Sequence, residues 1–174
     1  MIDDRLTEQQ LAAVAGLHER FERGGIDYWV FGGWAVDFHA GVITRPHADL
    51  DLAVWADDHE RIAGLLEADG WVHSPRLDED GSTLYSRGEV QLELAFLARA
   101  DDGEVYTPVR GGRAEWAPGA FEADLAHVGD VCARVISLES LVLEKSSPRD
   151  DPVASAKDRA DLATLAAKRQ HPRS

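Results

Sequence analysis

Hydrophobic residues near the start of the chain repeat every three or four positions, which is the period of an amphipathic helix. These residues are Leu11, Val14, Leu17 and Phe21. Thr7, followed three residues later by Gln10, matches a helix-capping pattern, and the pair Gly24-Gly25 is typical of a helix end. The sequence therefore predicts a first helix that begins at Thr7 and stops before the two glycines.

Short β-rich runs and further helical patterns fill the rest of the chain. The predicted strands are residues 27–31, 49–55, 83–86, 90–97 and 131–137, and the predicted helices are residues 34–41, 57–70, 137–145 and 153–169. Asp57 and Ser137 are predicted to cap two of these helices, and the Gly-, Pro- and Arg-rich stretch 107–120 is predicted to be a long loop. Since no regular βαβ rhythm is present, the pattern favours an α+β domain over a doubly wound one.

The composition narrows the kind of protein. A chain of 174 residues suits one compact domain, and a net charge of −14 disfavours nucleic acid as a substrate. The acidity either attracts metal ions and cationic small molecules or only confers solubility. The single Cys132 excludes an internal disulfide and a multi-cysteine metal site. With no signal-peptide pattern and no membrane-length apolar run, the expectation is a soluble cytoplasmic protein.

Two aspartates lie one residue apart on the predicted strand 49–55. Because side chains alternate along a strand, His47, Asp49 and Asp51 share one face. The apolar residues Ala48, Leu50, Leu52 and Val54 share the other. Neighbouring carboxylates cost stability unless a cation lies between them, and Mg²⁺ is commonly held by one or two carboxylates together with phosphates. The alternative is an ordinary acidic strand face exposed to solvent.

A glycine pair, Gly32-Gly33, follows the strand before this one and precedes a short helix. Two glycines permit a turn with positive φ and let a phosphate approach bare backbone N–H groups at a helix start. By itself the pair also fits a plain strand-to-helix turn. The order strand, Gly-Gly, helix, Arg-x-His and Asp-x-Asp is a more specific combination.

This combination resembles the polymerase-beta-like nucleotidyltransferase superfamily. The segments GGWAVD (residues 32–37) and TRPHADLDL (residues 44–52) are similar, more narrowly, to the antibiotic nucleotidyltransferases that adenylylate aminoglycosides or lincosamides. The resemblance implies a nucleotidyltransferase fold of the α+β class, with a mixed β-sheet flanked by helices. It also implies a catalytic domain over residues 1–135 and a small C-terminal helical segment over residues 136–174.

The family pattern includes a third carboxylate on a later strand. Glu93, which alternation places with Gln91 on the polar face of the run Val90–Leu97, is the candidate. Relatives mostly carry Asp at this point. The longer Glu either ligates metal and accepts a proton, or marks a retuned site, and the alternative is a surface Glu on an edge strand.

The implied reaction is the Mg²⁺-dependent transfer of a nucleoside monophosphate, AMP from ATP or another nucleoside triphosphate, to a hydroxyl of a small molecule. Asp49, Asp51 and Glu93 would hold two Mg²⁺ ions, with Glu93 also placed to act as general base. The Gly32 and Gly33 amides would hold the β- and γ-phosphates.

Three more side chains are candidates for nucleotide binding. Arg45 would pair with a triphosphate oxygen, His47 would orient an aspartate or contact phosphate, and Lys145 would bind phosphate. The alternatives are an exposed loop arginine, a structural histidine and a solvated helix face. The resemblance also offers Lys157 as a phosphate-binding residue, but a solvated face of the last helix is the simpler interpretation for Lys157, Asp158 and Asp161. Trp34 is interpreted as a core residue.

The acceptor stays open at this stage. Acidic turn residues suit a polycationic aminoglycoside or are ordinary turn residues: Asp78, Glu79, Asp80, Asp101 and Asp102. Trp116 and Phe121 offer an apolar wall for a lincosamide. The expected partners are a nucleoside triphosphate and a small hydroxylated acceptor, for a monomer or homodimer. The competing functions are a toxin-type nucleotidyltransferase acting on a macromolecule and a non-catalytic nucleotide-binding relative.

Overall fold

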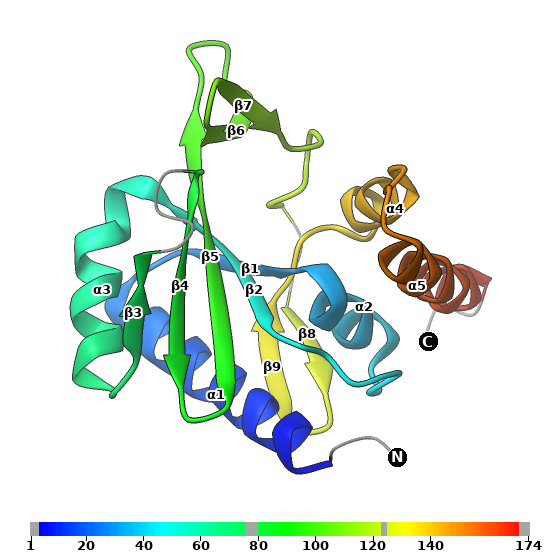
Figure 1. Cartoon of the computed structure of the whole chain (residues 1–174), viewed down its shortest axis with the longest axis horizontal. Helices are drawn as coiled ribbons and strands as arrows, with labels where there is room; N and C mark the ends of the chain where they lie inside the picture. The colour runs from blue at the N-terminus through cyan, green and yellow to red at the C-terminus, as the bar shows by residue number, and fades with distance from the viewer. Residues whose placement is uncertain (1–3, 76–79, 123–124, 171–174) are drawn as a thin grey trace.

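The computed structural model describes residues 4–75, 80–122 and 125–170 and consists of a mixed sheet with helices on both of its faces (Figure 1). The helices are α1 (Asp4–Gly24), α2 (Gly32–Ala40), α3 (His59–Ala68), α4 (Leu138–Ser146) and α5 (Pro152–Gln170). The strands are β1 (Tyr28–Phe31), β2 (Leu50–Trp55), β3 (Val72–Ser74), β4 (Ser82–Arg87), β5 (Val90–Arg99), β6 (Val105–Val109), β7 (Gly112–Glu115), β8 (Leu125–Val128) and β9 (Val131–Arg134).

The main sheet has the strand order β1-β2-β5-β4-β3, and β6 and β7 extend it from the far end of β5. β2 pairs in parallel with β5, whereas β1 pairs with β2 in the antiparallel sense. β8 and β9 form a separate hairpin. The sheet is therefore mixed and flanked by helices, as expected from the sequence.

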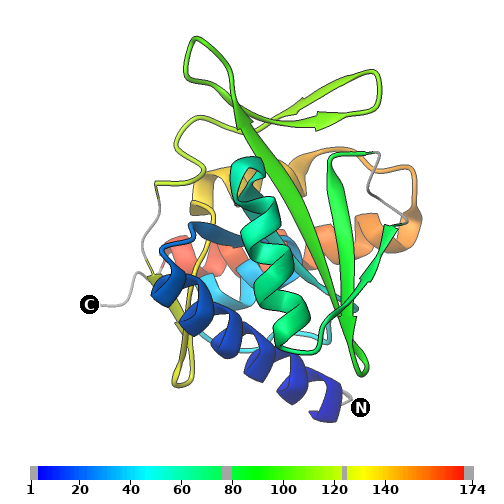
Figure 2. The ribbon, with the colours of Figure 1, turned by 90° about the vertical axis from the view of Figure 1, so that its left-hand side faces the viewer.

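The two faces of the sheet have different roles. Its apolar face lies against α1 and α3, which run across it in Figure 2, and bears residues that are at most 1% exposed: Val30, Leu50, Leu52, Val54, Leu92 and Leu94. The strand register puts Phe31, Asp51 and Glu93 side by side on the other face. That second face looks toward α4 and α5 (Figure 2).

Several predicted element boundaries are wrong. α1 begins at Asp4, so Thr7 lies inside the helix, and α3 begins at His59 without a side-chain cap from Asp57, which lies in the preceding 3₁₀ turn Ala56–Asp58. The stretch predicted to be a long loop contains most of β6 and all of β7, because Gly111, with a φ of +80°, permits a tight hairpin turn. The strand β8 was not predicted.

Other local predictions are confirmed. Ser137 caps α4, with its Oγ accepting the N–H of Ser140 at 3.2 Å, and Trp34 is 1% exposed in the core. None of the helices in the described part of the chain combines the length and apolarity needed to cross a membrane.

Candidate active site

A cleft of about 410 Å³ lies where the beginning of β2 approaches α2, α4 and α5. It is lined by every residue that the sequence singles out for catalysis or nucleotide binding: Gly32, Gly33, Arg45, His47, Asp49, Asp51, Glu93 and Lys145. Glu144 and Arg149, which sequence reasoning missed, line it as well. The fold thus gathers residues from four separate segments into one cavity.

The carboxylates of this cleft repel one another. Asp51 lies directly opposite Glu93 in the β2–β5 register, and Asp49 immediately precedes β2. Burial raises the pKa of Asp51 well above its usual range, and the charges of Asp49, Glu93 and Glu144 raise it further. Burial also raises the pKa of Glu93, although a hydrogen bond with Ser82 works in the opposite direction.

Excess negative charge of this kind fits a divalent cation. Lys145 acts to lower the pKa of Asp51, but burial and the neighbouring carboxylates outweigh it. In the described residues, no three His, Cys, Asp or Glu side chains are close enough to hold a metal ion by themselves. Two carboxylates completed by phosphate oxygens are nevertheless a common Mg²⁺ arrangement, so Asp49 and Asp51 are the residues that suit one.

The glycine pair is required by close approach. Gly32 has a φ of +66°, and a Cβ there would overlap Oδ2 of Asp51. A Cβ on Gly33 would lie 2.5 Å from Nδ1 of His47. The backbone of Gly32 acts to lower the pKa of the Glu144 carboxyl, whereas the bare backbone of Gly33 lies beside the side chains of Arg45 and His47.

Charged residues of α5 are buried in the cleft wall. Arg45 donates from Nε and Nη2 to the two carboxylate oxygens of Asp161, each at 2.9 Å. Lys145 Nζ lies 3.2 Å from Asp161 and 3.3 Å from Asp158, and Arg149 Nε lies 2.6 Å from Asp158. Burial acts to raise the pKa of Asp161, but Arg45 and Lys145 outweigh it and the pKa is lowered.

Two sequence-based interpretations are therefore wrong. Asp158 and Asp161 are 6% and 1% exposed, so they do not belong to a solvated helix face. The solvated alternative also fails for Lys145, which is 6% exposed, whereas Lys157 is exposed at the cleft edge. The physical reason is that each carboxylate gains a buried cationic partner from a distant segment.

His47 supports Arg45 rather than the aspartate pair. Its Nε2 lies 2.6 Å from Oδ2 of Asp37, and its Nδ1 lies 3.1 Å from Nη1 of Arg45. Because a guanidinium only donates, Nδ1 accepts and Nε2 carries the proton that is donated to Asp37. Gln10 fixes the backbone by donating to the His47 carbonyl at 3.1 Å.

A second cavity, of about 690 Å³, adjoins the cleft. We call this second cavity the acceptor hollow. Four residues line both cavities: Phe31, Glu93, Glu144 and Arg149. The acceptor hollow adds apolar walls from Trp116, Leu143 and Pro148 and two further carboxylates, Asp80 and Glu115. Of the acidic turn residues expected near the site, Asp78 and Glu79 lie outside the described residues, and Asp101 and Asp102 line neither cavity.

Comparison with known proteins places this geometry in a family. Residues 13–165 match the family described as aminoglycoside-2''-adenylyltransferase. The chain belongs to this family. The resemblance to antibiotic nucleotidyltransferases is thereby confirmed, and with it the assignment to a family of nucleotidyltransferase enzymes.

Individual relatives agree with the family assignment. A lincosamide resistance protein of Staphylococcus haemolyticus is 32% identical over 71 residues, and the match spans 41% of this chain and 42% of that protein's length. Lincomycin-bound LnuA, a lincosamide antibiotic adenylyltransferase, superimposes with a TM-score of 0.71 at 23% identity, covering 93% of this chain and 98% of LnuA. ANT(2'')-Ia, in complex with adenylyl-2''-tobramycin, gives 0.62 at 19% identity, covering 97% and 98%. These structures confirm the nucleotidyltransferase fold.

Proposed function

We propose that this family member is a Mg²⁺-dependent adenylyltransferase that transfers AMP from ATP to a hydroxyl of an aminoglycoside or lincosamide antibiotic. One observation carries the proposal. Glu93 lies opposite Asp51 in the sheet and lines both the cleft and the acceptor hollow. A hydroxyl bound in the hollow would therefore approach the phosphates from the side on which the carboxylates lie.

The nucleotide occupies the cleft in this proposal. Asp49 and Asp51 would hold Mg²⁺, which neutralises the triphosphate and lowers the pKa of the incoming hydroxyl. The Gly33 N–H and the exposed side chain of Lys157 line the same cavity and would bind phosphate oxygens, whereas Lys145, which is paired with Asp158 and Asp161, would contribute its charge from the cleft wall. Arg45 is already paired with Asp161, so its contribution is to hold the cleft wall in shape.

The chemical step is an in-line displacement. The acceptor hydroxyl oxygen forms a bond to the α-phosphorus, the bond from that phosphorus to the bridging oxygen breaks, and pyrophosphate leaves. Glu93 takes the hydroxyl proton, since it lines both cavities and also lies opposite Asp51 in the β2–β5 register. Ser82, which hydrogen-bonds Glu93, orients that carboxylate.

The acceptor hollow suits an antibiotic of either class. Trp116 and Leu143 provide apolar surface on which a sugar ring packs. Glu115 and Glu144 provide carboxylates for ammonium groups. The relatives point the same way, since one is named for lincosamide resistance and another is seen with an adenylylated aminoglycoside.

An acceptor panel tests the proposal. Aminoglycosides and lincosamides are incubated with ATP and Mg²⁺, and products are identified by mass spectrometry. We expect an AMP adduct and pyrophosphate with at least one acceptor, loss of both on chelation, and recovery with added Mg²⁺. Asp51→Asn should abolish turnover, whereas Asp150→Asn, at an exposed position, should keep it.

Three results would distinguish the proposed function from the alternative functions. Full activity in the Asp51→Asn variant would overturn the proposed mechanism. Nucleotide binding by calorimetry without any product would indicate a non-catalytic relative. Adducts found only on host proteins or tRNA after incubation with ATP would indicate a toxin-type enzyme.

A further inference from the structure

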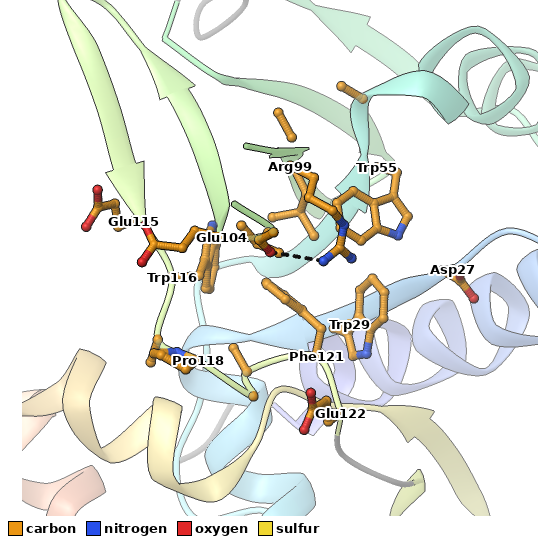
Figure 3. A pocket seen from close by; sticks show the side chains of 18 of the residues that line it. Asp27, Trp29, Trp55, Arg99, Glu104, Glu115, Trp116, Pro118, Phe121 and Glu122 are labelled. Carbon is orange, nitrogen blue, oxygen red and sulfur yellow. Dashed lines mark hydrogen bonds between the residues drawn. The ribbon is translucent and has the colours of Figure 1, made fainter. Parts of the chain in front are cut away.

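A third hollow, of about 1040 Å³, lies on the same face of the sheet but beyond the loop that follows β7 (Figure 3). Glu115, Trp116 and Ala117 line both this hollow and the acceptor hollow, so they form a partition between the two. None of Asp49, Asp51 and Glu93 lines it. We call it the aromatic hollow, and the proposed reaction makes no use of it.

Aromatic rings form one wall of the aromatic hollow. The Trp29 ring lies 6.2 Å from that of Trp55 and 4.9 Å from that of Phe121. Phe121 in turn lies 5.2 Å from Trp116. Figure 3 shows these side chains converging from β1, the end of β2 and the loop after β7. The edge-to-face contacts fix the rings, so the wall is formed before any ligand binds.

The lining of the aromatic hollow is strongly acidic. Among the described residues that line it are the carboxylates Asp27, Asp57, Asp102, Glu104, Glu115 and Glu122. The cationic side chain of its lining is Arg99, and its guanidinium carbon sits 5.0 Å from the Trp55 ring. Arg99 also donates to the carbonyl of Gly103 at 3.1 Å. A cation stacked on indole among carboxylates is thus already present in the fold.

We propose that the aromatic hollow is a second binding site, for a small organic polyamine whose ammonium groups face the carboxylates and whose carbon skeleton packs on the rings. Aromatic faces and carboxylates both attract cations, and the same charges exclude nucleotides and other anions. The volume matches that of sites for drug-sized molecules. The skeleton is either a linear chain or an amino sugar, and both present the same ammonium chemistry.

Calorimetry at low ionic strength tests the site without any reaction, with Mg²⁺ present to occupy the carboxylates of the cleft. The probes are spermine, a linear polyamine, and kanamycin, an amino sugar. We compare the double variant Asp57→Asn/Glu104→Gln with the control Glu8→Gln/Glu67→Gln, which changes the same charge at exposed positions on α1 and α3. The first should weaken binding about five- to tenfold and the control less than about twofold.

A substitution of opposite sign sharpens the test. Arg99→Gln removes the cation that already covers Trp55, so spermine or kanamycin should bind about two- to fivefold more tightly. The exposed Arg23→Gln control on α1 should leave binding unchanged. Sensitivity of one probe and not the other would support the site and assign its skeleton.

Three results would overturn the inference. Equal weakening in the two double variants would mean diffuse attraction to an acidic surface. Loss of polyamine binding in Asp49→Asn, with none in Asp57→Asn/Glu104→Gln, would place the ligand in the cleft instead. Absence of saturable binding by both probes would leave no site at all. No nucleotide is present, so none of these results depends on adenylyl transfer. Spermine has no hydroxyl to accept AMP, so its binding tests the aromatic hollow separately from the proposed function. Kanamycin binding that neither double variant weakens would place that probe in the acceptor hollow and would count against an amino sugar in the aromatic hollow.

Discussion

Neutralising Asp161 should destabilise the protein strongly. In Asp161→Asn the side chain keeps its shape, but its amide group now faces guanidinium donors that had paired with both carboxylate oxygens. Lys145 would then keep only Asp158, which Arg149 already engages, and Arg45 would lose both of its bonds to a carboxylate. The substitution leaves buried positive charge without compensation.

The magnitude follows from the burial of the group. The side chains of Asp161 and Lys145 are 2% and 5% exposed, while that of Arg45 is 21% exposed. Removing one partner of a fully buried ion pair costs about 3–5 kcal/mol. The partial exposure of Arg45 reduces this to about 2–4 kcal/mol, which for a chain of this length lowers the midpoint of thermal unfolding by about 5–15 °C.

The measurement is urea unfolding followed by circular dichroism, with calorimetric midpoints as a second observable. Asp150→Asn serves as the matched control, because it removes the same charge from an exposed position before α5. The control should lie within about 0.5 kcal/mol of the unchanged protein. In the double variant Arg45→Met/Asp161→Leu, both members of the pair are apolar, so the loss should be smaller than in Asp161→Asn.

The reasoning is refuted if Asp161→Asn unfolds within about 1 kcal/mol of the control. That outcome would mean that the α5 carboxylates contribute no more than exposed ion pairs do. The reasoning would also be contradicted if Arg45→Met/Asp161→Leu lost more stability than the summed losses of Arg45→Met and Asp161→Leu, because the coupling energy would then have the wrong sign.

Three further predictions concern the cleft and its surroundings. The pKa of Asp51 is raised in the folded protein, so stability is lost as the pH rises through that pKa and the carboxyl ionises. Asp51→Asn should therefore unfold at a higher temperature than the unchanged protein in metal-free buffer at neutral pH. A lower midpoint in scanning fluorimetry would contradict this. Gly33→Ala would force His47 away from the cleft, so the KM for ATP should rise about tenfold or more while the circular dichroism spectrum stays unchanged. An unaltered KM would count against the close approach of Gly33 to His47. Burial lowers the pKa of His39, so the free energy of unfolding should fall as the pH drops below about 6.5. In urea titrations between pH 7.5 and 5.5, His39→Gln should lose less stability than the unchanged protein. Equal losses in the two proteins would exclude His39 as the cause.

The sequence reveals the parts of the site that local rules control. Alternation along β2 and β5 is enough to place Asp51 and Glu93 on the polar side of the sheet, and the structure pairs them in register. The glycine pair is recognisable because it follows a strand and precedes a helix. These features depend on neighbours that are close in sequence or on strand periodicity.

The rest of the site depends on contacts between distant segments. Arg45 and Asp161 are 116 positions apart, and no periodicity relates them. The sequence pattern therefore predicts that the polar face of the last helix is exposed to solvent. Glu144 was missed because a glutamate beside Lys145 on a helix has no distinctive local pattern. One signal was available, since Asp158 and Asp161 stand three positions apart and therefore lie on the same side of a helix.

The partition formed by Glu115, Trp116 and Ala117 lies outside the strands that carry the reactive carboxylates. Substitutions in this short stretch would reshape the acceptor hollow and the aromatic hollow while the β2–β5 register kept Asp51 and Glu93 in place. Under the proposed function, a change in acceptor preference therefore requires only a few substitutions in this stretch. The residues that separate the two hollows and the carboxylates of the cleft thus lie on different segments of the chain.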